Sequence, residues 1–110
     1  MATTYKILGQ VEPSDTNNAD LYTVPSDTQA IVSTIVVTNT SGADKTFRIF
    51  VREAGAAAAT SNAIAYDAPI PGSGQVAFTL GITLSATDII SVRADQANSI
   101  TFQAFGSELT

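Results

Sequence analysis

The sequence predicts an all-β domain: an antiparallel β-sandwich of about eight strands, jelly-roll-like, with no substantial helix. Two observations support this prediction. Short runs of alternating apolar and polar residues recur along the chain, and turn-forming residues separate them every ~8–12 residues. This spacing is typical of two packed antiparallel sheets, although it leaves the strand connectivity open. With 110 residues, the chain has the size of one domain, and we expect residues 1–110 to form a single β-sandwich domain.

The first part of the chain contains three predicted strands. Residues 5–11 alternate between apolar and polar side chains, and the polar stretch at 13–20 is a loop. Residues 21–24 form a short strand that ends at Pro25, because proline cannot donate to a β-ladder. The run at 30–39 is the longest β-prone segment of the sequence.

This longest strand is apolar on both faces. Strict alternation places Ile31, Ile35 and Val37 on one face and Val32 and Val36 on the other. A strand with apolar side chains on both faces is typically buried on both. One face would pack in the core of the sandwich, and a neighbouring subunit could cover the other.

The second part of the chain continues the all-β pattern. Turn residues at 40–44 lead to a strand at 46–53, followed by the alanine-rich segment 54–62. Alanine favours helix, but Gly55 and the short length make a helix marginal, so we expect an exposed loop. Prolines and glycines separate the predicted strands at 64–68, 76–80 and 82–84, and the last predicted strands follow at 90–93 and 100–104.

The chain contains no cysteine and no histidine, which removes the commonest general base, thiol nucleophile and metal ligands. We therefore expect no catalytic residue, no metal site and no cofactor, and we predict that the protein is not an enzyme. A carbohydrate-active enzyme on a jelly roll is the competing hypothesis from that class. It needs two carboxylates, from among Glu53, Asp67, Asp88 and Glu108, to converge in a cleft.

Residues 15–20 begin like a calcium-binding loop. However, the fifth and sixth positions of this stretch are Ala19 and Asp20, where a calcium loop needs a ligand and a glycine, and no glutamate lies at the twelfth. Acidic and amide side chains in such turns commonly bond to nearby backbone N–H groups. We interpret this stretch as a turn.

Charge and hydropathy limit the possible partners. The formal charge is −5, and the five basic residues are scattered, so we expect no nucleic-acid binding. No segment approaches the ~18 apolar residues of a membrane span, and no signal peptide precedes the first strand, so synthesis in a cytoplasm and no membrane contact are expected. Charged residues make up only 14% of the chain, which favours a surface partly covered by protein partners.

The candidate contact residues are Arg48, Phe50 and Arg52, which share one face of their predicted strand. Arginine and aromatic side chains are enriched at the centres of protein interfaces. The alternative is a solvated face on which the arginine stems cover Phe50. Val32 and Val36, on the second apolar face described above, complete the set of candidates.

Several segments, in order along nearly the whole chain, resemble a family of small virion structural proteins of tailed bacteriophages, especially cyanophages. They are TTYKILGQ (3–10), LYTVP (21–25), IVVTN (35–39), GITL (81–84) with DII (88–90), and FQAFGSE (102–108). Each segment alone is ordinary strand sequence, and the resemblance lies in their combination and order.

The resemblance implies a β-sandwich displayed on the phage particle as a homotrimer. The leading hypothesis is a capsid decoration or cement protein, made in the host cytoplasm, that stabilises the head at the capsid surface by bridging major capsid protein subunits. Binding only to the assembled shell disfavours disassembly by mass action. The alternative is a neck, tail or fibre component that binds host-surface glycans, with Tyr22 and Tyr66 as the aromatic platform.

Overall fold

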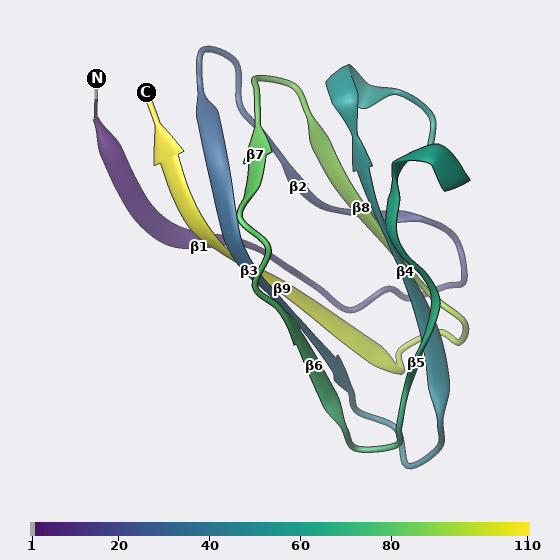
Figure 1. Ribbon diagram of the computed structural model, residues 1–110. Helices are drawn as coiled ribbons and strands as arrows, with labels where there is room; N and C mark the ends of the chain where they lie inside the picture. The colour runs from purple at the N-terminus through teal and green to yellow at the C-terminus, as the bar shows by residue number, and fades with distance from the viewer. Residues whose placement is uncertain (1) are drawn as a thin grey trace.

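The computed structural model, which describes residues 2–110, consists of two antiparallel sheets packed face to face (Figure 1). We call the sheet with the strand order β1-β9-β3-β6, in which β7 also pairs with β3, sheet A, and the sheet β2-β8-β4-β5 sheet B. The strands of sheet A are β1 Thr3–Val11, β3 Gln29–Asn39, β6 Gln75–Phe78, β7 Ile82–Leu84 and β9 Ile100–Leu109. Those of sheet B are β2 Ala19–Thr23, β4 Lys45–Arg52, β5 Ala63–Ile70 and β8 Ile89–Ala94.

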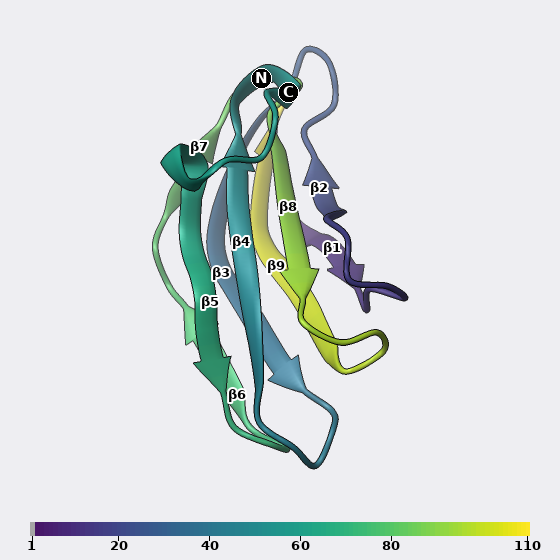
Figure 2. The same cartoon turned by 90° about the vertical axis from the view of Figure 1, so that its right-hand side faces the viewer.

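The connectivity is that of a jelly roll. Strands β6 and β7 act as one interrupted strand along β3, with a break at Leu80 and Gly81, whose φ is +66°. When β6 and β7 are counted as one strand, β1 pairs with β9, β2 with β8, β3 with β6 and β7, and β4 with β5. Figure 2 shows sheet B from its outer side, with β5, β4, β8 and β2 in order. The predicted sandwich of about eight strands is confirmed.

The core lies between the sheets and is centred on three aromatic rings. Phe47 of β4 meets Phe78 and Phe102 of sheet A edge to face, with ring centroids 6.0 and 6.1 Å apart. Phe47 and Phe102 are fully buried, and burial of such a side chain contributes roughly 2–3 kcal/mol. Phe47 and Phe102 lie at inward positions of β4 and β9, as the alternation of apolar and polar residues in these strands predicts, and their contact joins the two sheets.

In the described part of the chain, no helix is long and apolar enough to cross a membrane.

A buried asparagine closes one end of the sandwich. The Asn39 amide nitrogen donates to the carbonyl oxygens of Ala43, Ile70 and Pro71 at 2.8–3.2 Å. Its Oδ1 atom accepts from the backbone N–H and the hydroxyl of Ser41. Asn39 therefore joins the end of β3 in sheet A to the end of β5 in sheet B, and all its polar atoms are satisfied although it is 1% exposed.

A β-bulge in β3 corrects the predicted face assignment of this strand. The pairing of β3 with β9 shifts between Val32 and Thr34, so that Ser33 is an extra residue and the alternation changes phase there. As a result Val32 joins Ile35 and Val37 in the core and is 1% exposed. Ile31, expected inside, lies on the outer face with Val36 and is 42% exposed.

Two strands also extend clearly beyond the ends expected for them. Strand β5 continues through Pro69 to Ile70, because β5 is an edge strand and the missing N–H of proline is tolerated there. Strand β9 extends to Leu109, because its polar second half pairs with both β1 and β3. The segment 54–62 is a loop, as predicted, with short 3₁₀ turns at Glu53–Gly55 and Thr60–Asn62.

Strand β9 passes close to its neighbour β3 at Gly106. A Cβ atom at this position would lie 2.0 Å from the carbonyl oxygen of Ile31, well inside van der Waals contact. The obstacle is backbone within a paired ladder, which cannot move without separating the strands. Gly106 thus permits the close passage of β9 beside the bulge of β3.

We expect Gly106→Ala to lower the free energy of unfolding by about 2–3 kcal/mol, as overpacking against rigid backbone does. Gly42→Ala is the matched control, because nothing lies within 4 Å of its Cβ position. The control should change stability by less than ~0.5 kcal/mol. Urea unfolding followed by circular dichroism measures both variants, and equal stabilities would contradict the close approach.

Candidate protein-interaction surfaces

The outer face of sheet B presents the arginines predicted from sequence. The pairing of β4 with β5 shifts between Phe47 and Ile49, so that Tyr66 and Asp67 together lie opposite Arg48, and Asp67 has φ +50°. The Arg48 Nε atom donates to Oδ1 of Asp67 at 2.7 Å, and its guanidinium lies 4.0 Å from the centroid of the Tyr66 ring. This hydrogen bond raises the pKa of Arg48 and lowers the pKa of Asp67.

Phe50 and Arg52 share this outer face, as predicted, but both are engaged within the chain. Phe50 is only 4% exposed and meets the Tyr66 ring edge to face, and the loop 53–62 folds over it. Arg52 donates to the carbonyl oxygens of Gly55 and Ala56 and to side chains of β2 and β8, with Nε 2.6 Å from the Ala56 oxygen. Arg52 therefore holds the loop in place, and of the three residues Arg48 is the best placed for contact with a partner.

Arg93 of β8 is a residue of this face that sequence reasoning missed. It lies directly opposite Arg48 across the ladder, an unfavourable pair of like charges. Within residues 2–110, no hydrogen bond or ion pair engages the guanidinium of Arg93, whereas Arg48 is paired with Asp67. Two shallow hollows, one on each side of Arg48, are both lined by Arg48 and Arg93.

The outer face of sheet A has a different chemistry, because none of its side chains is charged. The register with β9, whose Ile100, Phe102 and Ala104 are buried, identifies the outward positions of its neighbours. These positions are Thr3, Tyr5, Ile7 and Gln10 of β1; Thr101, Gln103, Phe105, Ser107 and Leu109 of β9; Gln29, Ile31, Ser33, Thr34, Val36 and Thr38 of β3; Gln75 and Ala77 of β6; and Thr83 of β7. We call this set of side chains the uncharged face.

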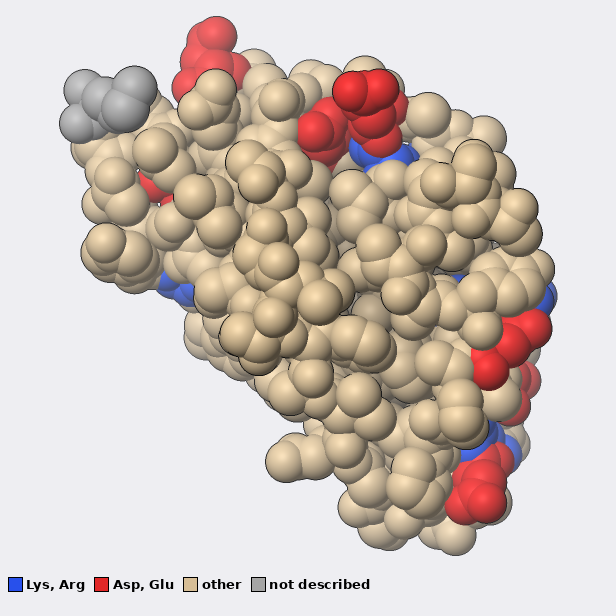
Figure 3. All heavy atoms as spheres, viewed as in Figure 1, with Lys and Arg blue, Asp and Glu red and all other residues tan. Residues whose placement is uncertain are grey.

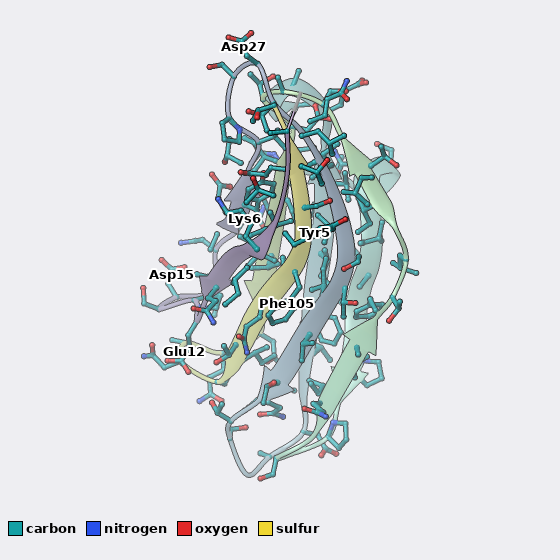
Figure 4. All side chains as sticks on the ribbon, turned by 90° about the vertical axis from the view of Figure 1, so that its left-hand side faces the viewer. Tyr5, Lys6, Glu12, Asp15, Asp27 and Phe105 are labelled. Atoms are coloured by element: carbon teal, nitrogen blue, oxygen red, sulfur yellow. The ribbon has the colours of Figure 1, made fainter. Side chains whose placement is uncertain are left out.

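The most exposed apolar side chains of the uncharged face come from its two longest strands and the edge strand. Tyr5 is 84% exposed, Ile7 53% and Ile31 42%, and partly exposed Phe105 lies between β1 and β3. Figure 4 shows Tyr5 and Phe105 over this face, while the labelled charged residues lie along its margins. Val36 belongs to this face, so that one of the predicted contact residues lies on it.

The charged residues of the molecule are distributed around, and not on, the uncharged face. Sheet B alone carries Asp20, Arg48, Arg52, Asp67 and Arg93 on its outer side. Figure 3, in the view of Figure 1, shows charges at the top, along the right-hand margin, where β4 and β5 lie, and in small patches at the left, with a broad tan area between them. At one corner of the uncharged face, Thr101 donates to Glu12, which follows the end of β1.

Three of the four carboxylates considered for catalysis have separate structural partners. Asp67 pairs with Arg48, and Asp88 accepts the backbone N–H groups of Ala54 and Ser85. Glu108 accepts from Tyr22 at 2.5 Å and from Lys6 at 3.2 Å. Within residues 2–110, no three acidic, histidine or cysteine side chains gather as a metal site would require.

The remaining sequence motifs also have defined places. The backbone N–H of Asn17 donates to Oδ1 of Asp15, which confirms the first part of the turn predicted at 15–20, whereas Ala19 and Asp20 already belong to β2. Tyr22, one of the two tyrosines of the glycan hypothesis, is 8% exposed and packs in the core. Tyr66 is 48% exposed, and the guanidinium of Arg48 covers one face of its ring. An open platform of these two rings is therefore not present.

No protein-family model matches the chain, and no curated protein matches it. Among solved structures, it is similar to a chain of infectious bursal disease virus Gx strain, with 12% identity and a TM-score of 0.48, over 97% of this chain and 30% of that one. A chain of the Gt strain gives 11% identity and a TM-score of 0.39, over 97% and 28%. This chain thus spans less than a third of the viral chains that it matches, and similarity at this level assigns it to no family.

The Tyr22–Glu108 hydrogen bond makes stability depend on pH. The bond lowers the pKa of Glu108, because it favours the carboxylate, and burial raises the pKa of Tyr22. Its contribution is therefore present above the ordinary glutamate pKa of ~4.3 and is lost as the pH falls through the lowered value.

We expect Tyr22→Phe to lower the free energy of unfolding by roughly 1–2 kcal/mol at pH 7, and by less at an acidic pH below the ordinary glutamate range, because protonation of Glu108 removes the charge from the acceptor of this hydrogen bond. Tyr5→Phe, at an 84% exposed tyrosine, is the control and should be neutral at both pH values. Urea unfolding at the two pH values makes the comparison, and a cost for Tyr22→Phe that does not change with pH would contradict this role of Glu108.

Proposed function

We propose that this protein is a structural component of a bacteriophage virion, a capsid decoration or cement protein that bridges major capsid protein subunits at the surface of the head. What supports the proposal is the presence of two opposite faces, each suited to protein contact and differing in chemistry. One is the uncharged face of sheet A, and the other is the outer face of sheet B, with its arginines and hollows. The resemblance of the sequence to virion structural proteins points in the same direction.

Contact with the shell is assigned to the outer face of sheet B. Its strands carry three arginines and two aspartates, so these strand positions have a net charge of +1 on a chain whose formal charge is −5, and Asp95 lies beside them at one of the hollows. The free guanidinium of Arg93 beside the paired Arg48 suits a carboxylate on the partner, since arginine binds carboxylates through two parallel hydrogen bonds. Such a pair would also relieve the repulsion between the two arginines.

In this proposal the protein catalyses no reaction. It binds the assembled shell and not the free subunits of the shell. Binding of that kind stabilises the shell by mass action in proportion to occupancy. The two hollows would receive side chains of the shell protein, with Tyr66 as the aromatic anchor at the margin of one of them.

We expect Arg93→Glu to weaken binding of the purified protein to phage heads that lack it by at least about tenfold, or ~1.4 kcal/mol. Lys45→Glu makes the same change of charge at another residue of sheet B and should leave binding within about twofold. Co-sedimentation with heads measures both variants. Equal binding by the two would remove Arg93 from the contact.

Cryo-microscopy of intact particles tests the location. Density for this sandwich over junctions between major capsid subunits is the expected result. Density confined to the neck, tail or fibres would overturn the decoration role in favour of the alternative virion component. Absence of the chain from purified particles would overturn a virion role altogether.

A further inference from the structure

We propose that the uncharged face of sheet A is a self-association interface, on which a second copy of this chain packs sheet on sheet about a two-fold axis. The motivating observation is the complete lack of charge across the outward positions of β1, β9, β3, β6 and β7. The chain has fifteen charged residues, five basic and ten acidic, and all of them lie elsewhere. A sheet face that met only water would ordinarily carry charged side chains along its strands.

The composition of this face shares one feature with a homodimer interface. Charged residues are depleted at the centres of such interfaces, while aromatic and aliphatic residues are enriched. Here charge is absent, Tyr5, Ile7, Ile31 and Phe105 supply an apolar cluster on the β1 side of the face, and most of the other positions are threonine, serine or glutamine. The rim carries charge, with Lys6 and Glu12 next to it on the side of β1 (Figure 4).

The charge distribution favours a second copy over a foreign partner. A foreign partner of an acidic protein is typically selected and steered by opposite charge, which this face cannot provide. Each copy has a formal charge of −5, so two copies repel each other. Contact through a surface free of charge buries none of these charges. The charges that remain lie around the margins, where salt screens them over ~8–10 Å.

The same reasoning favours a two-fold axis. In a heterologous contact, the uncharged face would meet a different surface of the neighbouring copy. The outer face of sheet B would then have to give up the hydration of Arg48, Arg93 and Asp67, at a cost that an uncharged partner surface does not offset. An isologous contact pairs the uncharged face with itself and buries no charge.

The size of the face is sufficient for a stable contact. Four strands at ~4.8 Å spacing and about ten residues at ~3.3 Å each give a footprint of roughly 600 Å² per copy. Two copies would bury about 1,200 Å², the lower limit of specific protein interfaces, so we expect a dissociation constant of roughly 1–100 μM. Sheets that pack face to face lie ~10 Å apart.

Sedimentation equilibrium of the purified chain, from about 1 to 300 μM, tests the inference over the range of the expected dissociation constant. We expect a reversible monomer–dimer equilibrium, with a mass approaching twice 11.4 kDa. Ile31→Glu should shift the dissociation constant upward by at least about tenfold, because it places two carboxylates in the interface. Ile64→Glu is the matched control: Ile64 is 39% exposed on the outer side of sheet B, close to the 42% of Ile31, and association should be unchanged.

A second variant separates loss of association from loss of fold. Tyr5 is 84% exposed, so Tyr5→Glu should leave the circular dichroism spectrum and thermal unfolding unchanged while weakening association. A wild-type chain that stays monomeric throughout, or association that neither Ile31→Glu nor Tyr5→Glu weakens, would overturn the inference. The two-fold dimer differs from the homotrimer that the resemblance implies, and a trimer would overturn the two-fold arrangement. The sedimentation experiment contains no other virion protein. A negative result would therefore not count against the proposed binding to the shell, which co-sedimentation with phage heads tests separately.

Discussion

The arrangement of sheet A depends on how β9 pairs with its two neighbours, β1 and β3. Strand β9 alternates regularly over its whole length, whereas β1 and β3 each have a bulge at the same level, at Leu8 and Ser33. Each bulge changes which residues of its strand face the core. Gly106 of β9, beside the bulge of β3, allows the close backbone passage that this pairing needs. Without the two bulges, Val32 would face outward and the apolar surface of sheet A would have a different composition.

The bulges also explain how one small chain can have two unlike outer faces. In sheet A they turn Ile31 outward and keep Tyr5 and Ile7 outward, next to threonine, serine and glutamine side chains. In sheet B a third bulge brings Tyr66 and Asp67 together at Arg48. One face is suited to burial without loss of charge hydration, and the other is suited to carboxylate-bearing partners. The proposed roles of self-association and shell binding follow from this division.

The sequence was sufficient to predict the sandwich, because period-two alternation and turn residues determine where strands begin and end. It could not supply the bulges, since an extra residue leaves the composition of a strand unchanged and only shifts the phase of its alternation. Val32 and Ile31 were exchanged for this reason. The same limit applies to the candidate surfaces. Arg48 lies on the outer face of β4, as the alternation predicts. The hydrogen bonds that hold Arg52, however, are to carbonyl oxygens of a loop, and periodicity does not predict the path of a loop. Arg93 and the uncharged face become visible only when the strands are placed side by side.

The central claim is that the outer side of sheet A is covered by a second copy of the chain. Isoleucine-methyl NMR spectra recorded through a dilution series test it most directly, because the probes Ile7 and Ile31 lie on the uncharged face and Ile64 lies on sheet B. The account predicts that the Ile7 and Ile31 signals move with concentration while the Ile64 signal stays fixed. Movement of Ile64 alone, or of none of the three, would contradict it.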